Sequence, residues 1–336
     1  NSRVASIDLF KFICAAAIVA IHISPFSSMS EQVEFFFIHV LFRVAVPFFC
    51  MTTGYFLAQQ LTFEHGKLKA SRENRMCIAR TWKKNAKLYV VWSAVYLLVY
   101  IPLWKRIGWL SAWAFVDWGI AAVRSGSYYH LWYVLSLLYA LPILWVCLTV
   151  VDKKHLPIAA VVLYLFKAAS YGYRWAFPQT MFTLFKVMDA LDGVVTACTL
   201  IVPYILLGMT VYWKQERKTL SPILLFGISL LMVMLEAFML LGRDAEAYSY
   251  ILFSMPTAYF FFLIVLQLNE KIENKDFSML ARSSVIVYCA HPAVNAGVEK
   301  VIPQAGPIRF AVVLGISFLL SILALAIDRR IKALKA

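Results

Sequence analysis

The chain has 336 residues, of which 62% are hydrophobic and 15% carry a charge, and its mean hydropathy is +0.74. This composition excludes an ordinary water-soluble globular protein and indicates a polytopic membrane protein. The formal net charge of +14 does not indicate nucleic acid binding, because the basic residues follow the loops rather than one face of a helix.

Apolar windows of membrane-spanning length recur along the whole chain and predict an all-α integral membrane fold of about ten helices. The windows cover residues 6–24, 35–58, 86–103, 130–150, 156–171, 193–213, 222–241, 248–268, 279–298 and 308–327. The tryptophan-rich stretch 103–129 predicts an amphipathic segment at the outer interface, and 174–191 is a candidate for another. The six cysteines show neither a disulfide framework nor a metal-binding spacing, so we expect no metal site.

The loop charges predict the orientation. With the N-terminus in the cytoplasm, 21 lysines and arginines fall on the cytoplasmic side and nine on the outer side. The positive-inside rule therefore places both termini in the cytoplasm. We expect residues 1–330 to form one transmembrane domain and residues 331–336 to be a basic cytoplasmic exit, consistent with a following domain that this chain does not contain.

The first window carries three aligned polar side chains. Lys11 and His22 are 11 positions apart, close to three helical turns, so they share one stripe, with Asp8 about 40° away. Polar side chains are costly in hydrocarbon, so this stripe is expected to face protein or water. We predict His22, Asp8 and Lys11 as catalytic residues. The alternative is that Asp8 and Lys11 form an interfacial pair and that His22 lies at the opposite interface.

The predicted orientation gathers further polar residues in the outer half of the membrane. These candidates for substrate binding are Arg43, Glu236, His130 and His291, with His39 at a similar depth. Each has a structural alternative. Arg43 and Glu236 could form an ion pair between helices, and His130 could anchor its helix at the interface. His291 precedes Pro292 and could satisfy the backbone that the proline leaves free.

A basic loop precedes the third window. Residues 67–87 hold eight basic side chains, which would attract anionic lipid headgroups without any further function. The functional alternative is a phosphate site formed by Arg80, Lys84 and Lys87.

Several motifs in order resemble the acyltransferase-3 family of membrane proteins. They are Ile7-Asp8-x-x-Lys11 with His22, Arg43-Val-Ala-Val-Pro-Phe-Phe, Thr53-Gly54-Tyr55, His130-Leu-Trp-Tyr and Tyr288-Cys-Ala-His291-Pro. The resemblance implies a helical bundle and adds Tyr55 to the substrate-binding set. In the family an arginine pair before the third helix is thought to meet the phosphates of acyl-CoA, and here Lys84 and Lys87 stand at those positions.

A narrower resemblance concerns the membrane domain of the VanT-type serine racemases of vancomycin resistance. It rests on the Arg43 run, Tyr129-His-Leu-Trp-Tyr, the Lys84-x-x-Lys87 pair, Leu191-Asp192-Gly193 and the His-Pro of the ninth window. In those proteins the membrane domain is thought to supply L-serine to a cytoplasmic racemase domain that uses pyridoxal phosphate. That domain is absent from this chain, so we expect no cofactor here.

Two functions follow from these resemblances. The first is a membrane module that binds or translocates L-serine for a racemase domain. The second is an O-acyltransferase, in which His22 is the general base and an acyl group moves from cytoplasmic acyl-CoA to a small outer hydroxyl acceptor. Both imply a multi-pass protein of a bacterial plasma membrane, in contact with lipids and not with nucleic acid, and both leave room for a homodimer.

The orientation can be tested by cysteine accessibility in a cysteine-free background. A cysteine at Ser27 should react with a membrane-impermeant reagent from the outside, and one at Ser71 from the inside, because the charge count places these loops on opposite sides. Labelling of both positions from the same side would contradict the predicted orientation.

Overall fold

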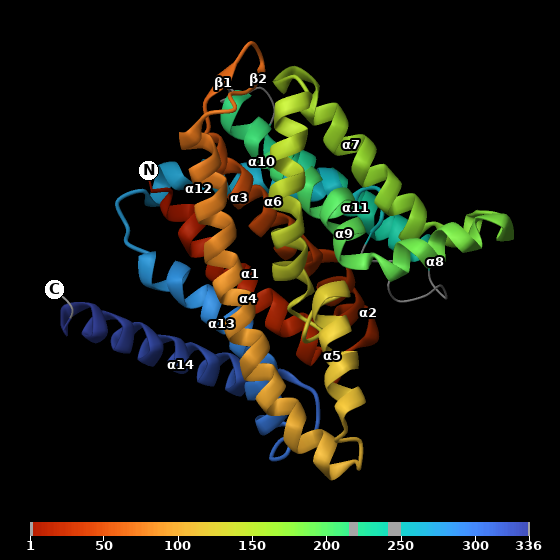
Figure 1. The fold of residues 1–336 in the computed structure, drawn as a ribbon, viewed down its shortest axis with the longest axis vertical. Helices are drawn as coiled ribbons and strands as arrows, with labels where there is room; N and C mark the ends of the chain where they lie inside the picture. Colours follow the sequence, from red (N-terminus) through yellow and green to blue (C-terminus); the bar gives the residue numbers. More distant parts are fainter. Residues whose placement is uncertain (1–2, 215–220, 241–249, 335–336) are drawn as a thin grey trace. The chain divides into compact units, whose positions relative to one another are not determined.

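The computed structural model describes residues 3–214, 221–240 and 250–334, and these are predominantly helical (Figure 1). The α-helices are α1 (Ala5–Ile23), α2 (Glu31–Glu34), α3 (Ala45–Ala58), α4 (Arg72–Arg106), α5 (Ala112–Arg124), α6 (Trp132–Val150), α7 (Leu156–Lys167), α8 (Phe182–Ala190), α9 (Asp192–Thr196), α10 (Val202–Lys214), α11 (Pro222–Met239), α12 (Ser254–Ile272), α13 (Ser278–Val298) and α14 (Pro307–Leu334).

Short segments of other geometry interrupt or join these helices. Three are π-helical, η1 (Phe35–Leu41), η4 (Ala168–Gly172) and η7 (Ala197–Ile201). Four are 3₁₀ turns, η2 (Phe42–Val44), η3 (Lys153–His155), η5 (Arg174–Ala176) and η6 (Gln179–Met181). Strands β1 (Phe63–Glu64) and β2 (Lys67–Leu68) pair antiparallel, with Phe63 opposite Leu68.

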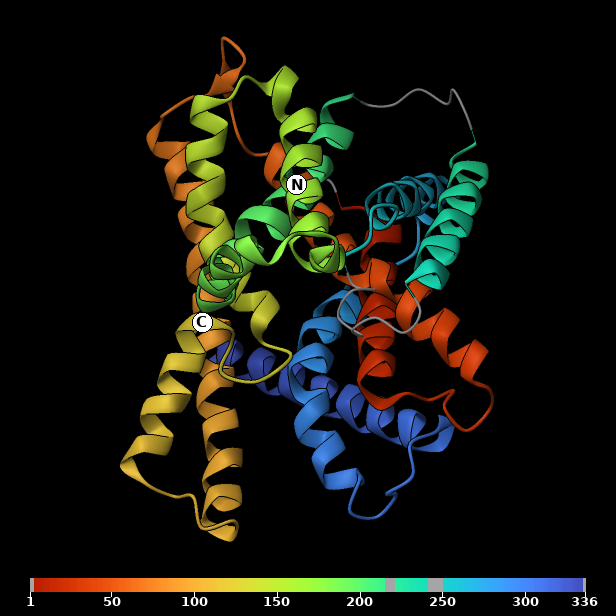
Figure 2. The same ribbon diagram turned by 90° about the vertical axis from the view of Figure 1, so that its right-hand side faces the viewer.

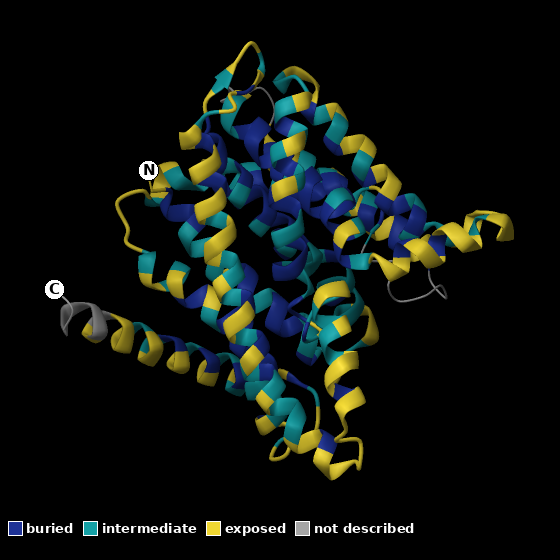
Figure 3. Cartoon of the chain, in the orientation of Figure 1, coloured by how far each residue is buried: buried dark blue, intermediate teal, exposed yellow. Residues whose placement is uncertain are grey.

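The all-α membrane fold is confirmed. Among the described residues, eight helical segments are long and apolar enough to cross a membrane. They are Ala5–Ile23, Glu31–Ala58, Arg72–Arg106, Trp132–Val150, Lys153–Gly172, Asp192–Lys214, Pro222–Met239 and Pro307–Asp328. The two remaining predicted windows fold as α12 and α13, which do not meet that criterion, so the count of ten stays a prediction, as does the orientation. Figure 3 shows exposed residues along α4 and α14, as expected for helices that face lipid.

The interpretation of residues 67–87 as a loop is wrong. Only its first part is irregular, and from Arg72 onward it is the first half of α4. The helix begins there because the side chain of Ser71 accepts a hydrogen bond from the backbone N–H of Asn74, and Glu73 lies in the positive first turn. Good helix formers then continue without a break into the apolar window.

The chain divides into two compact units. Unit 1 contains Asn1–Phe49, Leu220–Gly242 and Pro256–Ala336, and unit 2 contains Cys50–Thr219 and Arg243–Met255. Unit 1 therefore holds α1, α11, α13 and α14, whereas unit 2 holds the helices from α4 to α10. The division falls inside α3, so this helix contributes to both.

Unit 1 is built on α1, α13 and α14. Arg3 forms an ion pair with Asp276 just before α13, while the ring of His22 contacts that of His291 far along α13. Helices α1 and α13 therefore run side by side in the same direction, as Figures 1 and 2 show. An apolar core between them and α14 includes Ala15, Val19, Ile23, Val287 and Val313.

Unit 2 contains a close crossing of α3 and α10 that two glycines make feasible. A Cβ atom on Gly54 would collide with the backbone of Ile205, and one on Gly208 would collide with the backbone of Met51. Small residues allow membrane helices to approach in this way, since lipid offers no hydrophobic drive for helix association. The glycine of the Thr53-Gly54-Tyr55 motif thus has a packing role.

The substitution Gly208→Ala should destabilise the protein by about 1–3 kcal/mol, because the added methyl group meets backbone that cannot turn aside. Thermal unfolding in detergent measures the change. The matched control is Gly227→Ala on α11, where a Cβ atom has no neighbour within 4 Å. An equal loss of stability in both variants would contradict the close crossing.

Candidate functional site

The conformation of His291 follows from the proline beside it. Pro292 lies inside α13 and has no N–H, so the carbonyl oxygen of Tyr288, four residues earlier, loses its helical donor. His291 Nδ1 lies 2.8 Å from that oxygen and 3.2 Å from the carbonyl oxygen of Val287. The interpretation that His291 satisfies the freed backbone is therefore confirmed.

This bond also fixes the tautomer of His291. Because a carbonyl oxygen only accepts, Nδ1 carries the proton, and in the neutral ring Nε2 carries the lone pair. The whole side chain is buried. The structural role thus uses the Nδ1 atom of the ring.

The second imidazole of this site belongs to His22. Its ring stacks on that of His291 with centroids 5.3 Å apart and an angle of 21° between the planes. His22 is in the last turn of α1, where the helix ends at Ser24 in the left-handed conformation. The two histidines, predicted independently from motifs almost 270 residues apart, are therefore brought together within unit 1.

Arg43 adds a positive charge near this pair. It lies in η2, which packs against α1, and its guanidinium interacts electrostatically with the His22 ring. Its Nε donates to the carbonyl oxygen of Ile38 at 3.1 Å, and its Nη2 is 3.5 Å from Nδ1 of His39. The π-helical turn η1 supplies both of these neighbours, and π-helical turns are common at functional sites.

Glu236 also belongs to unit 1. It is buried one turn before the end of α11, and α11 packs against η1. The segment η1 carries His39 and leads into η2, which carries Arg43, so Glu236 lies on a helix next to that part of unit 1. We define the histidine site as His22, Arg43, Glu236 and His291.

Asp8 and Lys11 form a different cluster. Lys11 is about 16 Å along α1 from His22, and its ammonium bonds the carboxylate of Asp8 at 3.3 Å. Asp8 also accepts from Arg3, which in turn reaches Asp276. Hydrogen bonds from the backbone N–H and hydroxyl of Ser278, then from Arg3, lower the pKa of Asp276 to about 2. This network ties the start of α1 to the start of α13, apart from the histidine site.

Two predicted residues belong to unit 2. His130 is buried among the rings of Tyr96, Tyr128 and Tyr129, whose centroids lie 5.0–5.7 Å from its own. Tyr55 packs edge-on against Tyr212 at 5.4 Å. The structure thus assigns both to aromatic clusters of that unit.

The predicted phosphate residues share one face of α4. Arg80, Lys84 and Lys87 are exposed and spaced four and three residues apart, so they lie on one stripe. As this part of the chain is helical, they form a regular basic face, which we call the α4 basic face. It belongs to unit 2.

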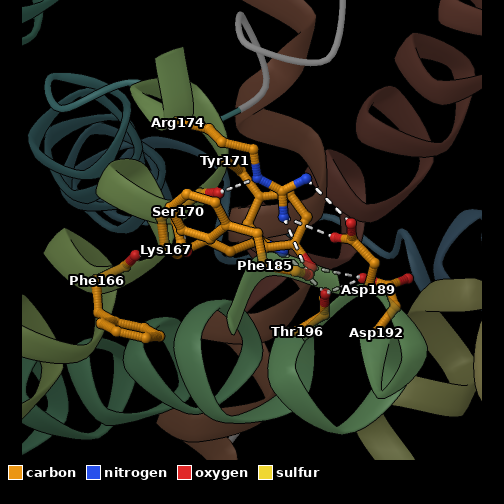
Figure 4. A network of polar contacts seen from close by, with 9 residues as sticks. All are labelled: Phe166, Lys167, Ser170, Tyr171, Arg174, Phe185, Asp189, Asp192 and Thr196. Carbon is orange, nitrogen blue, oxygen red and sulfur yellow. Dashed lines mark hydrogen bonds and ion pairs between the residues drawn. The ribbon is translucent and has the colours of Figure 1, made fainter. Parts of the chain in front are cut away.

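A polar cluster around Lys167, which the motifs did not reveal, lies in a membrane-spanning segment of unit 2 (Figure 4). The side chain is completely buried. Its ammonium donates to Thr196 Oγ1 at 3.0 Å and lies 3.3 Å from the centre of the Tyr171 ring. The hydroxyls of Thr196 and Tyr171 both donate to Asp192. The charge count places Lys167 on the outer side, although its position inside the apolar window 156–171 is a signal of burial.

The arrangement at the histidine site suits proton exchange and anion binding. Neutral imidazole nitrogens accept a proton or a hydrogen bond near neutral pH, and guanidinium groups bind carboxylates. Among the described residues no group of histidine, cysteine, aspartate or glutamate side chains is arranged to hold a metal ion.

Comparison with known proteins identifies the family. A family model described as an acyltransferase domain matches residues 4–326, nearly the entire chain. The chain belongs to the acyltransferase-3 family. No solved structure matches it.

Three curated relatives carry racemase names. An amino-acid racemase of Enterococcus faecalis is 26% identical over 99% of this chain, and another from the same organism is 35% identical over 51%. A serine/alanine racemase of Enterococcus gallinarum is 28% identical over 87% of the chain. The matches cover 47%, 23% and 41% of the length of these relatives, so this chain spans less than half of each.

The two histidines should respond differently to substitution. His291→Ala leaves the Tyr288 carbonyl oxygen without this hydrogen bond. It should lower the free energy of unfolding by about 1–3 kcal/mol and should also reduce activity. His22→Ala should abolish binding or acyl transfer while the melting temperature stays near that of the wild type. If His22→Ala retained full serine uptake and full acyl transfer, the histidine pair would be structural.

Proposed function

We propose that this chain is the membrane module of a serine racemase, which binds or translocates L-serine for a cytoplasmic racemase domain. Membership of the acyltransferase-3 family and the racemase names of the curated relatives support this assignment. The module would lie in the bacterial plasma membrane and contribute to vancomycin resistance through the cell wall. Pyridoxal phosphate would belong to the racemase domain, and no residue of this chain is assigned to it.

The observation that carries the proposal is the stacked imidazole pair, the half-buried His22 on the buried His291, near the Arg43 guanidinium. L-Serine presents a carboxylate, an ammonium and a hydroxyl group. In the proposed complex Arg43 binds the carboxylate, because a guanidinium matches the two carboxylate oxygens. His291 Nε2 accepts from the hydroxyl or the ammonium, and Glu236 balances the ammonium charge.

The α4 basic face supports the same choice. Lys84 and Lys87 are compact point charges and lack the planar guanidinium with which arginine binds two phosphate oxygens. We infer that this face is poorly suited to acyl-CoA and that its lysines meet anionic lipid headgroups instead.

The alternative is an O-acyltransferase, favoured by the family itself and by the stacked histidines. In this function His22 removes the proton from an acceptor hydroxyl while the hydroxyl oxygen attacks the acyl carbonyl carbon, and coenzyme A leaves as a thiol. The α4 basic face would then hold the acyl-CoA phosphates. One ligand-binding experiment separates the two functions.

Purified protein in nanodiscs should bind L-serine in a titration with radiolabelled ligand and show little affinity for acetyl-CoA. Arg43→Ala should weaken serine binding by roughly tenfold to a hundredfold, since a hydrogen bond to a charged group contributes about 1.5–3 kcal/mol. Arg43→Lys keeps the charge but loses the planar guanidinium group. Its affinity for L-serine should lie between those of the wild type and Arg43→Ala.

Misfolding is the main competing cause of lost binding, because a buried charge that loses a partner costs about 3–5 kcal/mol. The double variant Arg43→Ala/Glu236→Ala removes both charged side chains together and should fold, yet still not bind serine. Tight binding of acetyl-CoA with transfer of the acetyl group to a hydroxyl acceptor, and no serine binding, would replace the proposal by the acyltransferase.

A further inference from the structure

Helix α13 continues past its own proline as far as Val298. A residue that precedes a proline is disfavoured in the helical conformation, because the proline ring clashes with its backbone and its Cβ atom. His291 holds that position and is nevertheless helical. The hydrogen bond from its ring to the Tyr288 carbonyl oxygen lies before the proline and does not hold the turn beyond it. That turn depends on support from another element.

Arg309, in the first turn of α14, supplies contacts at this point. Its side chain is only 8% exposed. Nε donates to Oδ1 of Asn295 at 2.9 Å, and Nη1 donates to the carbonyl oxygen of Pro303 at 3.1 Å. Nη2 is 3.1 Å from Oε1 of Glu299, the residue that ends α13. Each guanidinium nitrogen thus contacts an acceptor on α13 or on the connection that follows it.

Helix α14 by itself does not favour an arginine at this place. A cation in the first turn meets the positive end of the helix dipole, and a buried charge is costly unless it is paired and hydrogen-bonded. The acceptors that Arg309 contacts offset both costs. Its contacts therefore join the start of α14 to the end of α13.

The histidine site lies next to these contacts along α13. Asn295 is one turn after His291 and on the same side of the helix, since residues four apart are neighbours on a helix surface. Val298, three residues further on, belongs to the apolar core that α13 forms with α1 and α14. The ring of His291 stacks on that of His22 at the end of α1. All of these residues belong to unit 1, so fixing Asn295 fixes the helix directly after the residue that carries the imidazole.

We propose that Arg309 is a positioning residue that, through Asn295, fixes the end of α13 and so keeps the ring of His291 stacked on that of His22 for serine. The inference rests on the proposed function. A lysine ammonium at this position would reach some of the acceptors, but it lacks the planar guanidinium that spans all three.

The test compares variants of Arg309 and Asn295 in nanodiscs by titration with radiolabelled L-serine. Arg309→Ala should weaken serine binding about tenfold, the lower end of the range for losing a hydrogen bond to a charged group. Asn295→Ala should give a similar loss, and the two losses should not add in the double variant, because the residues act through one contact. Arg309→Lys should bind with intermediate affinity.

The matched control is Glu299→Gln. Glutamine keeps an oxygen acceptor for Arg309, and the Glu299 side chain is 56% exposed. This variant should therefore bind serine as the wild type does. Should Arg309→Ala fail to fold, Arg309→Lys and Asn295→Ala carry the same comparison.

The ring nitrogens of His291 give a readout that a general loss of stability would not change. Nitrogen NMR of protein with isotope-labelled histidine should show a proton on Nδ1 in the wild type and in Glu299→Gln, and a mixture of tautomers in Arg309→Ala. A lower melting temperature of Arg309→Ala with unchanged serine affinity and unchanged His291 signals would overturn the proposal and leave the proposed function intact. If the wild type failed to bind serine, the proposed function would fail, and the His291 signals alone would decide whether Arg309 positions the ring.

Discussion

Lipid hydrocarbon offers no hydrogen bonds, and this constraint decides where the polar groups of the chain can lie. In α13 a proline leaves the Tyr288 carbonyl oxygen without its helical donor, and the imidazole of His291 supplies the replacement. That bond orients the imidazole so that the ring stacks on the ring of His22. The candidate site of unit 1 thus begins at one backbone defect and at the side chain that compensates for it.

Unit 2 meets the same constraint by different means. Lys167 is a full charge within a spanning segment, and the rings of Tyr171 and Tyr250 and the hydroxyl of Thr196 contact its ammonium. Asp192 balances it through Thr196 and Tyr171. Gly193, the next residue, allows close approach of the backbone of Arg124 at the end of α5. The Leu-Asp-Gly motif therefore combines a charge partner with a packing position.

Much of the fold could be predicted from the sequence, because apolar windows are long and their composition is distinctive. The family and the pairing of the His22 and His291 motifs in one site also followed from local patterns. The helical state of residues 72–87 did not, because a high density of charge resembles a loop when capping by Ser71 is overlooked. The burial of His130 and of Lys167 depends on contacts between distant segments that periodicity cannot reveal.

The central claim is that the histidine site of unit 1 holds L-serine. A cryo-electron microscopy structure of the protein in nanodiscs with saturating L-serine tests it most directly. The claim predicts ligand density against Arg43 with its other end at the ring of His22 or His291. Serine density at some other place, or no serine density together with an acyl chain that ends at His22 when acyl-CoA is supplied, would contradict it.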